Sequence, residues 1–136
     1  MHTIDYNKRR GQNGAIHHSR DQIGEGVGSH TIDLNLAQID SEVTVCLFVL
    51  SAYASASLLD ITSASISFAD VDISLELCSY ILDSHDKVSH LKYIMMCKLY
   101  KTSTSRWHVQ AIGDSYGGSA DNYEPNTKQL KNICRV

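Results

Sequence analysis

Basic residues are scarce in this chain of 136 residues, and that scarcity argues against one large class of functions. Lysine and arginine number 12 against 15 aspartates and glutamates, so the formal net charge is −3. Domains that bind nucleic acids usually carry a basic field that meets the phosphates. The one basic run here, Lys8-Arg9-Arg10, is interpreted as a solvated turn. We therefore expect no nucleic-acid partner.

Long hydrophobic runs are also missing. The best apolar stretch, residues 43–53, is too short to span a bilayer and is interpreted as a buried strand. The N-terminal residues lack the apolar core of a signal peptide. From these two absences we expect a cytoplasmic protein that does not enter a membrane.

Proline and paired cysteines are the remaining shortages. Pro125 is the single proline, and no linker-like tract interrupts the chain, so one domain is predicted over residues 1–136. The four cysteines never form a Cys-x-x-Cys pair, and the spacing of a zinc ribbon is absent. Three of them fall in apolar runs, which indicates buried structural thiols rather than metal ligands.

What the sequence does contain is a series of short segments in which polar and apolar residues alternate. Residues 31–36 have this period, which is typical of a half-buried strand. Residues 43–50 are rich in β-branched side chains and are predicted to be a central strand buried on both faces. Residues 90–100 and 106–112 alternate on either side of a polar stretch, which predicts a hairpin. Many short strands of this kind favour an all-β sandwich of mostly antiparallel strands.

The phase of the alternation changes once. Apolar side chains occupy even positions in residues 65–68 and odd positions in residues 71–77. Because a slip of one residue moves every side chain to the other face, a bulge or a turn is predicted at Ala69-Asp70. Residues 51–65 are predicted to be a loop, and residues 128–134 a short helix or strand.

The richest segment chemically is residues 21–28, Asp-Gln-Ile-Gly-Glu-Gly-Val-Gly. It combines the carboxylates Asp21 and Glu25 with glycines at alternate positions, and Asp33 follows on the next strand. Calcium takes six to eight oxygen ligands, many of them backbone carbonyls, and glycines allow the backbone to turn such carbonyls inward. On the residues alone, a tight turn with exposed acids is the simpler interpretation, and a calcium loop is the alternative. The segment has neither the ligand spacing of an EF-hand nor that of a dinucleotide-binding loop.

The order of these motifs resembles the tellurium-resistance (TerD) family of calcium-binding stress proteins. In that family the loop runs Ser-Gly-Asp-Asn-x-Thr-Gly-Glu-Gly-x-Gly-Asp-Asp-Glu and is followed by a strand reading Ile-x-Val-Asp-Leu. Here residues 19–28 read Ser-Arg-Asp-Gln-Ile-Gly-Glu-Gly-Val-Gly and residues 31–34 read Thr-Ile-Asp-Leu. Residues 6–10, 14–19 and 111–118 also follow the family's order, so the resemblance runs from Tyr6 to about Tyr123.

The resemblance implies a non-enzymatic stress-response domain that binds calcium through Asp21 and Glu25, with Asp33 and Asp114 as further ligands. Ser29 and His30 stand where the family has acids, which lowers the charge available to a cation. From the resemblance, the chain is expected to correspond to the C-terminal two-thirds of a typical family domain, with the sandwich incomplete at its N-terminal edge. That edge is a candidate surface for a protein partner or for self-association.

Two alternatives remain open. One is an interaction or scaffold module that has lost calcium binding, and the other is a small-ligand protein of the cyclic-nucleotide-binding kind that some family members resemble. No catalytic residues are predicted, because the chain has no Gly-x-Ser-x-Gly elbow around a nucleophile. His17 and His18 are adjacent and are expected to point to opposite faces of a strand, so one metal ion cannot readily use both.

Overall fold

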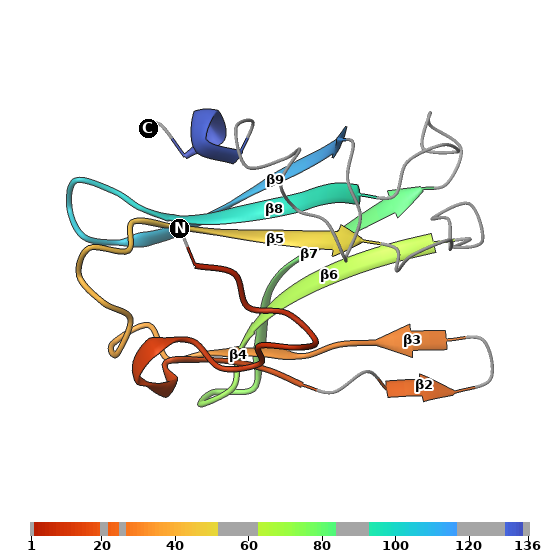
Figure 1. Cartoon of the computed structure of the whole chain (residues 1–136), viewed down its shortest axis with the longest axis horizontal. Coiled ribbons are helices and arrows are strands. Elements are labelled where there is room, and N and C mark those ends of the chain that lie inside the picture. Colours follow the sequence, from red (N-terminus) through yellow and green to blue (C-terminus); the bar gives the residue numbers. More distant parts are fainter. Residues whose placement is uncertain are drawn as a thin grey trace. The chain divides into compact units, whose positions relative to one another are not determined.

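The computed structural model describes residues 2–19, 22–24, 27–51, 63–83, 93–116 and 130–134. Every pair of neighbouring strands in these residues is antiparallel, which confirms the all-β fold class (Figure 1). The chain divides into two compact units, Met1–Val43 and Thr44–Val136. The single domain predicted for residues 1–136 stays a prediction.

The first unit is built around two short ladders. In the first, β1 (Ile16–His18) pairs with β4 (Ile32–Leu34). In the second, β2 (Gln22–Gly24) pairs with β3 (Val27–Ser29). We call these two ladders together the N-terminal arm (Figure 1). A short 3-10 helix, η1 (Gln12–Gly14), precedes β1.

The backbone before η1 lines the other edge of β1. Arg10 forms an isolated antiparallel bridge with His17, and the N–H of His18 donates to the carbonyl of Arg9 at 2.8 Å. This pairing covers the edge of β1 that β4 does not occupy. Backbone groups on both sides of β1 are therefore hydrogen-bonded, which holds His17 and His18 in extended conformation.

The second unit contains a three-stranded sheet in the order β5-β8-β9. Its strands are β5 (Val45–Ser51), β8 (Tyr93–Lys101) and β9 (Trp107–Tyr116). The predicted hairpin is confirmed as β8 and β9, whose connection is closed by the N–H of Thr102 donating to the carbonyl of Arg106 at 2.8 Å.

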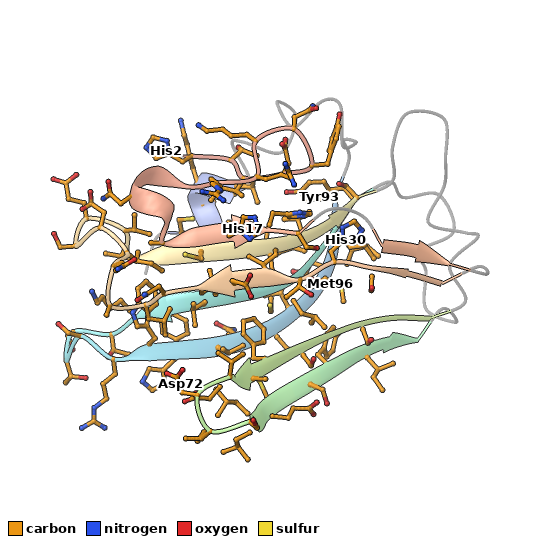
Figure 2. All side chains as sticks on the ribbon, turned by 90° about the horizontal axis from the view of Figure 1, so that it is seen from below. His2, His17, His30, Asp72, Tyr93 and Met96 are labelled. Carbon is orange, nitrogen blue, oxygen red and sulfur yellow. The ribbon has the colours of Figure 1, made fainter. Side chains whose placement is uncertain are left out.

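The prediction that residues 43–50 form the central strand is wrong. That place belongs to β8, which pairs with β5 on one side and β9 on the other. Its residues 93–97 are all buried, from Met95 at 0% exposed to Met96 at 3%, whereas Phe48, at 8% exposed, is the one buried residue of β5 (Tyr93 and Met96 are labelled in Figure 2). A run of β-branched residues indicates side chains that pack well on a pleated strand. It does not indicate how deeply that strand is buried.

A separate hairpin is formed by β6 (Ser63–Asp70) and β7 (Leu75–Asp83). The predicted change of phase is confirmed, because the register shifts between Phe68 and Ala69. The first apolar residues at odd positions, Val71 and Ile73, however lie in the turn, and β7 begins only at Leu75. The N–H of Asp72 donates to the Asp70 carboxylate at 3.0 Å, a local bond that favours a turn over continued extension (Figure 2).

The β6–β7 hairpin and the three-stranded sheet meet through two aromatic rings. Phe48 of β5 and Phe68 of β6 pack edge to face, with ring centroids 5.2 Å apart and planes at 89°. The outward positions of the hairpin stay exposed, including Leu77 at 61% and Ile81 at 66%. The hairpin thus has one side near the core and an apolar side open to solvent.

The C-terminal segment left open between helix and strand forms one helical turn over residues 130–133. The N–H of Cys134 donates to the carbonyl of Leu130 at 3.0 Å, and the Leu130 side chain is buried. Most of the loop predicted for residues 51–65 lies outside the described residues, and Ser63 onward belongs to β6.

The cysteines are only partly as expected. All four are free, Cys97 is buried, and Cys46 and Cys134 are half-buried. Cys78 is exposed on β7, so its prediction as a buried thiol is wrong. Cys78 pairs with Phe68, on the face of the hairpin opposite to Ile81, and residues 75–79 of β7 are all exposed, so both faces of this part of β7 are open to solvent.

Candidate functional site

The glycine-rich segment forms part of the N-terminal arm. Ile23 stands opposite Gly28, and Gly24 opposite Val27, in the β2–β3 ladder. Asp21 and Glu25, the two principal candidate ligands, lie outside the described residues. Gly28 has no left-handed φ, and a Cβ built on it meets nothing within 4 Å. This glycine therefore follows ordinary extended backbone in the β2–β3 ladder.

A shift of register separates the two ladders of the arm. His18 faces Ile32 in the first, and Gln22 faces Ser29 in the second, which displaces the pairing by one residue. An extra residue in one strand is the signature of a β-bulge, and bulges occur preferentially beside functional sites, where they redirect side chains. The shift falls next to the position of Asp21 in the sequence.

Ser19 stabilises the end of the first ladder with both its backbone and its side chain. Its N–H donates to the carbonyl of Thr31 at 2.8 Å. The N–H of Thr31 in return donates to the Ser19 hydroxyl at 2.9 Å. The Ser19 carbonyl oxygen lies 2.6 Å from Nδ1 of His18. The Ser19 hydroxyl thus accepts the hydrogen bond that a backbone carbonyl would accept in a regular ladder. The Ser19 carbonyl is left to face the imidazole of His18.

Asp33 lies in the middle of β4, opposite His17. One carboxylate oxygen, Oδ2, is 3.5 Å from Nδ1 of that histidine, and the two side chains are 68% and 40% exposed (His17 is labelled in Figure 2). The carboxylate is therefore solvent-accessible and held on the same arm as the glycine-rich segment.

Asp114 lies in β9, in the second unit, and follows a bulge. Met95 pairs with Asp114 and Cys97 with Ala111, so two residues of β9 oppose Met96 alone. One of the two is Gly113, whose φ of 73° is a conformation that glycine adopts without strain. The bulge sets the direction of the exposed Asp114 side chain. Its expected approach to the Asp21 loop stays a prediction, because the two residues belong to different units.

The fit of these residues to calcium rests on donor chemistry. Carboxylates and backbone carbonyls suit a hard cation, and the segment supplies both kinds. Within the described residues, no three His, Cys, Asp or Glu side chains gather around one point. A calcium ion would therefore depend on Asp21 and Glu25 for its principal charge, with Asp33 as the described carboxylate on the same arm.

The structure also brings together a pair of histidines that the sequence does not single out. His18 and His30 pack edge to face, with ring centroids 5.4 Å apart and planes at 63° (His30 is labelled in Figure 2). The expected divergence of His17 and His18 is confirmed, since one meets Asp33 and the other meets His30. The register of the arm, which places His30 two residues from the partner of His18, is the signal that would have revealed the pair.

The fold and this arm define a class: an all-β protein with an acidic, glycine-rich segment carried on paired strands. The TerD domain family model matches residues 1–122, so the chain belongs to the TerD family, which is of the tellurium-resistance stress-response type. The match spans both compact units. A comparison with curated proteins returned no match. In the part of the chain that the structure describes, no helix is long and apolar enough to cross a membrane.

Proposed function

We propose that this chain is a non-enzymatic, cytoplasmic stress-response domain that binds calcium through residues 21–28. Asp21 and Glu25 are the principal ligands in this proposal, and Asp33 and Asp114 are further ones. Family membership over residues 1–122 supports the stress-response role. The remaining points rest on the chemistry of the loop.

The observation that carries the calcium proposal is the construction of the N-terminal arm. Paired strands lie on both sides of Glu25, and the register shift lies beside Asp21. Strand pairing already restricts the backbone on either side of such a loop. Less conformational entropy is therefore lost when its oxygen ligands bind a cation. Asp33 adds an accessible carboxylate in the β1–β4 ladder of the same arm.

Calorimetric titration of the full chain with calcium chloride tests this function. We expect binding that weakens strongly in Asp21→Asn and Glu25→Asn, because each change removes one charge from the ligand set. Asp72→Asn is the matched control, since Asp72 is an exposed carboxylate in the β6–β7 turn. A folded wild-type chain that takes up no calcium at millimolar concentration would exclude the calcium role.

A second candidate, an interaction module without calcium, is favoured by the apolar side of the β6–β7 hairpin. The exposed fractions of Val71, Ile73 and Leu77 are 81%, 66% and 61%. Side chains of this kind on one hairpin are typical of a contact surface. If this function holds through self-association, light scattering over a range of protein concentrations would show oligomers of the wild-type chain. Leu77→Ser, which removes an apolar side chain from this surface, would weaken that association. The small-ligand alternative stays a prediction.

A further inference from the structure

Two imidazole rings occupy the same face of the N-terminal arm. His18 pairs with Ile32 across the β1–β4 ladder, and His30 lies two residues before Ile32, in the segment that joins β3 to β4. Backbone bonding continues into that segment, because the N–H of Ser19 donates to the carbonyl of Thr31 at 2.8 Å. The ring centroids of His18 and His30 are 5.4 Å apart. The contact is thus built into the register of the arm.

The orientation of His18 is fixed by its neighbour. Nδ1 of the ring lies 2.6 Å from the carbonyl oxygen of Ser19. A carbonyl oxygen only accepts hydrogen bonds, so Nδ1 carries the proton and donates it. In the neutral ring this leaves the lone pair on Nε2. Histidines that ligate metals almost always donate their other ring N–H to a carbonyl or carboxylate, which sets the tautomer and raises the basicity of the ligating nitrogen.

We propose that His18 and His30 form a two-imidazole site for a divalent transition metal, with zinc as the reference ion. Zinc binds imidazole nitrogen at about 2.0 Å in tetrahedral geometry, which places two ligating rings with centroids about 5 Å apart. The observed 5.4 Å agrees with that spacing. No third His, Cys, Asp or Glu joins the pair among the residues described, so water completes the coordination and the affinity is modest.

This site is chemically separate from the proposed calcium loop. Calcium takes oxygen ligands, whereas imidazole suits zinc, copper and nickel. The proposal therefore goes beyond the proposed function and does not depend on it. Ser29 and His30 stand where the family resemblance leads one to expect acids, and the replacement exchanges an oxygen donor for a nitrogen donor on this arm.

Calorimetric titration of the full chain with zinc chloride tests the site. All proteins carry Cys78→Ser, because the exposed Cys78 thiol is itself a zinc ligand. We expect one binding event, with affinity at least about tenfold lower in His18→Ala and in His30→Ala, since each removes one of two protein ligands. The control variants are His108→Ala, on β9, and His2→Ala, beside the N-terminal amine.

A second measurement needs no substitution at either histidine. Nitrogen-15 spectra of the imidazoles in the Cys78→Ser chain report the tautomer of His18 and the nitrogen that zinc perturbs. We expect a protonated Nδ1 that persists on zinc addition and a resonance shift at Nε2. Undiminished zinc affinity in either His18→Ala or His30→Ala, loss of binding in His2→Ala or His108→Ala, or an Nε2 resonance unmoved by zinc would overturn the proposal.

Discussion

His17 and Asp33 stand opposite each other in the β1–β4 ladder, with Nδ1 of the imidazole 3.5 Å from Oδ2 of the carboxylate. Both side chains are substantially exposed, at 40% and 68%. Exposed pairs of this kind contribute little to stability because water screens them. The position of Asp33 is therefore set by the ladder, and its charge remains accessible to a cation.

Replacement of Asp33 by asparagine separates its structural role from its role as a ligand. We expect the free energy of unfolding to change by less than about 1 kcal/mol, whereas calcium affinity falls several-fold because one anionic ligand is lost. Denaturant titration measures the first quantity and calorimetry the second. His17→Gln is the control, since it breaks the same pair but keeps the carboxylate. Equal calcium affinities in Asp33→Asn and the wild type would remove Asp33 from the ligand set.

Burial on β8 predicts a sharp contrast between two apolar residues. Met95 is 0% exposed and Leu77 is 61% exposed. We expect Met95→Ala to cost about 2–5 kcal/mol of unfolding free energy, because it empties a filled core position. Leu77→Ala should cost less than about 1 kcal/mol, since its side chain already faces water. Denaturant midpoints measured at one pH compare the two, and similar losses in both variants would place the core elsewhere.

The strands of the second unit follow from sequence periodicity, but the arrangement of those strands does not. Alternation identifies β8 and β9 and predicts a bulge or a turn at Ala69-Asp70, next to the observed register shift between Phe68 and Ala69. It cannot rank strands by depth, because burial depends on which strands become neighbours. Thus β5, with its β-branched residues, lies at the edge of the three-stranded sheet, and the methionine- and cysteine-containing β8 lies in the middle.

The candidate site divides in the same way. Donor chemistry and family resemblance identify Asp33 and Asp114 from the sequence, yet the ladder partner of Asp33 and the bulge beside Asp114 come from long-range pairing. The contact between His18 and His30 likewise needs the register of the arm. The sequence gives the chemical type of each residue, whereas the register of strand pairing determines which residues become its neighbours.

The difference in environment between Cys97 and Cys78 predicts different reactivity. Burial raises the pKa of the Cys97 thiol to about 12 from its ordinary 9.0, and the nearby Cys78 adds to the rise. The thiolate is the reactive form, so Cys97 should resist alkylation by iodoacetamide at pH 8 while the exposed Cys78 reacts. Mass spectrometry of peptides locates the label. Labelling in denaturant is the control, and there both cysteines should react at similar rates.

The raised pKa of Cys97 also predicts a loss of stability in alkaline solution. Between pH 9 and about 12 the thiol ionises in the unfolded chain but stays protonated in the folded one. Proton release then favours unfolding, so this contribution is fully present below pH 9 and declines above it, by up to about 1.4 kcal/mol per pH unit. Denaturant titrations from pH 8 to pH 10.5 measure the slope. A Cys97→Ala chain with the same slope would show that other groups cause it.

The ring contact between Phe48 and Phe68 predicts a measurable coupling between the three-stranded sheet and the β6–β7 hairpin. Edge-to-face aromatic pairs contribute about 0.5–1.5 kcal/mol beyond the area they bury. A double-mutant cycle with Phe48→Leu and Phe68→Leu should return a coupling energy in that range. A cycle of Phe48→Leu with Trp107→Leu, which removes a ring on β9, is the control. Additive losses in the Phe48–Phe68 cycle would mean that the two rings do not hold the sheets together.

Two glycines predict opposite responses to the same substitution. Gly113 has a φ of 73° in the β9 bulge, a conformation that costs an L-residue about 1–2 kcal/mol. Gly113→Ala should therefore lower the unfolding free energy by roughly that amount. Gly28 lacks a left-handed φ and has open space around it, so Gly28→Ala should leave stability unchanged or slightly raised. Denaturant titration compares the two variants.

The same two variants carry a functional consequence. The bulge at Gly113 sets the direction of the neighbouring Asp114 side chain. If Asp114 serves calcium, Gly113→Ala weakens calcium binding in the chain that remains folded, and Gly28→Ala leaves it intact because the β2–β3 backbone tolerates a side chain there. A large loss of calcium affinity in Gly28→Ala, at unchanged stability, would instead indicate that the loop must leave the extended ladder to bind the ion. Calorimetric titration of both variants with calcium chloride decides between these outcomes.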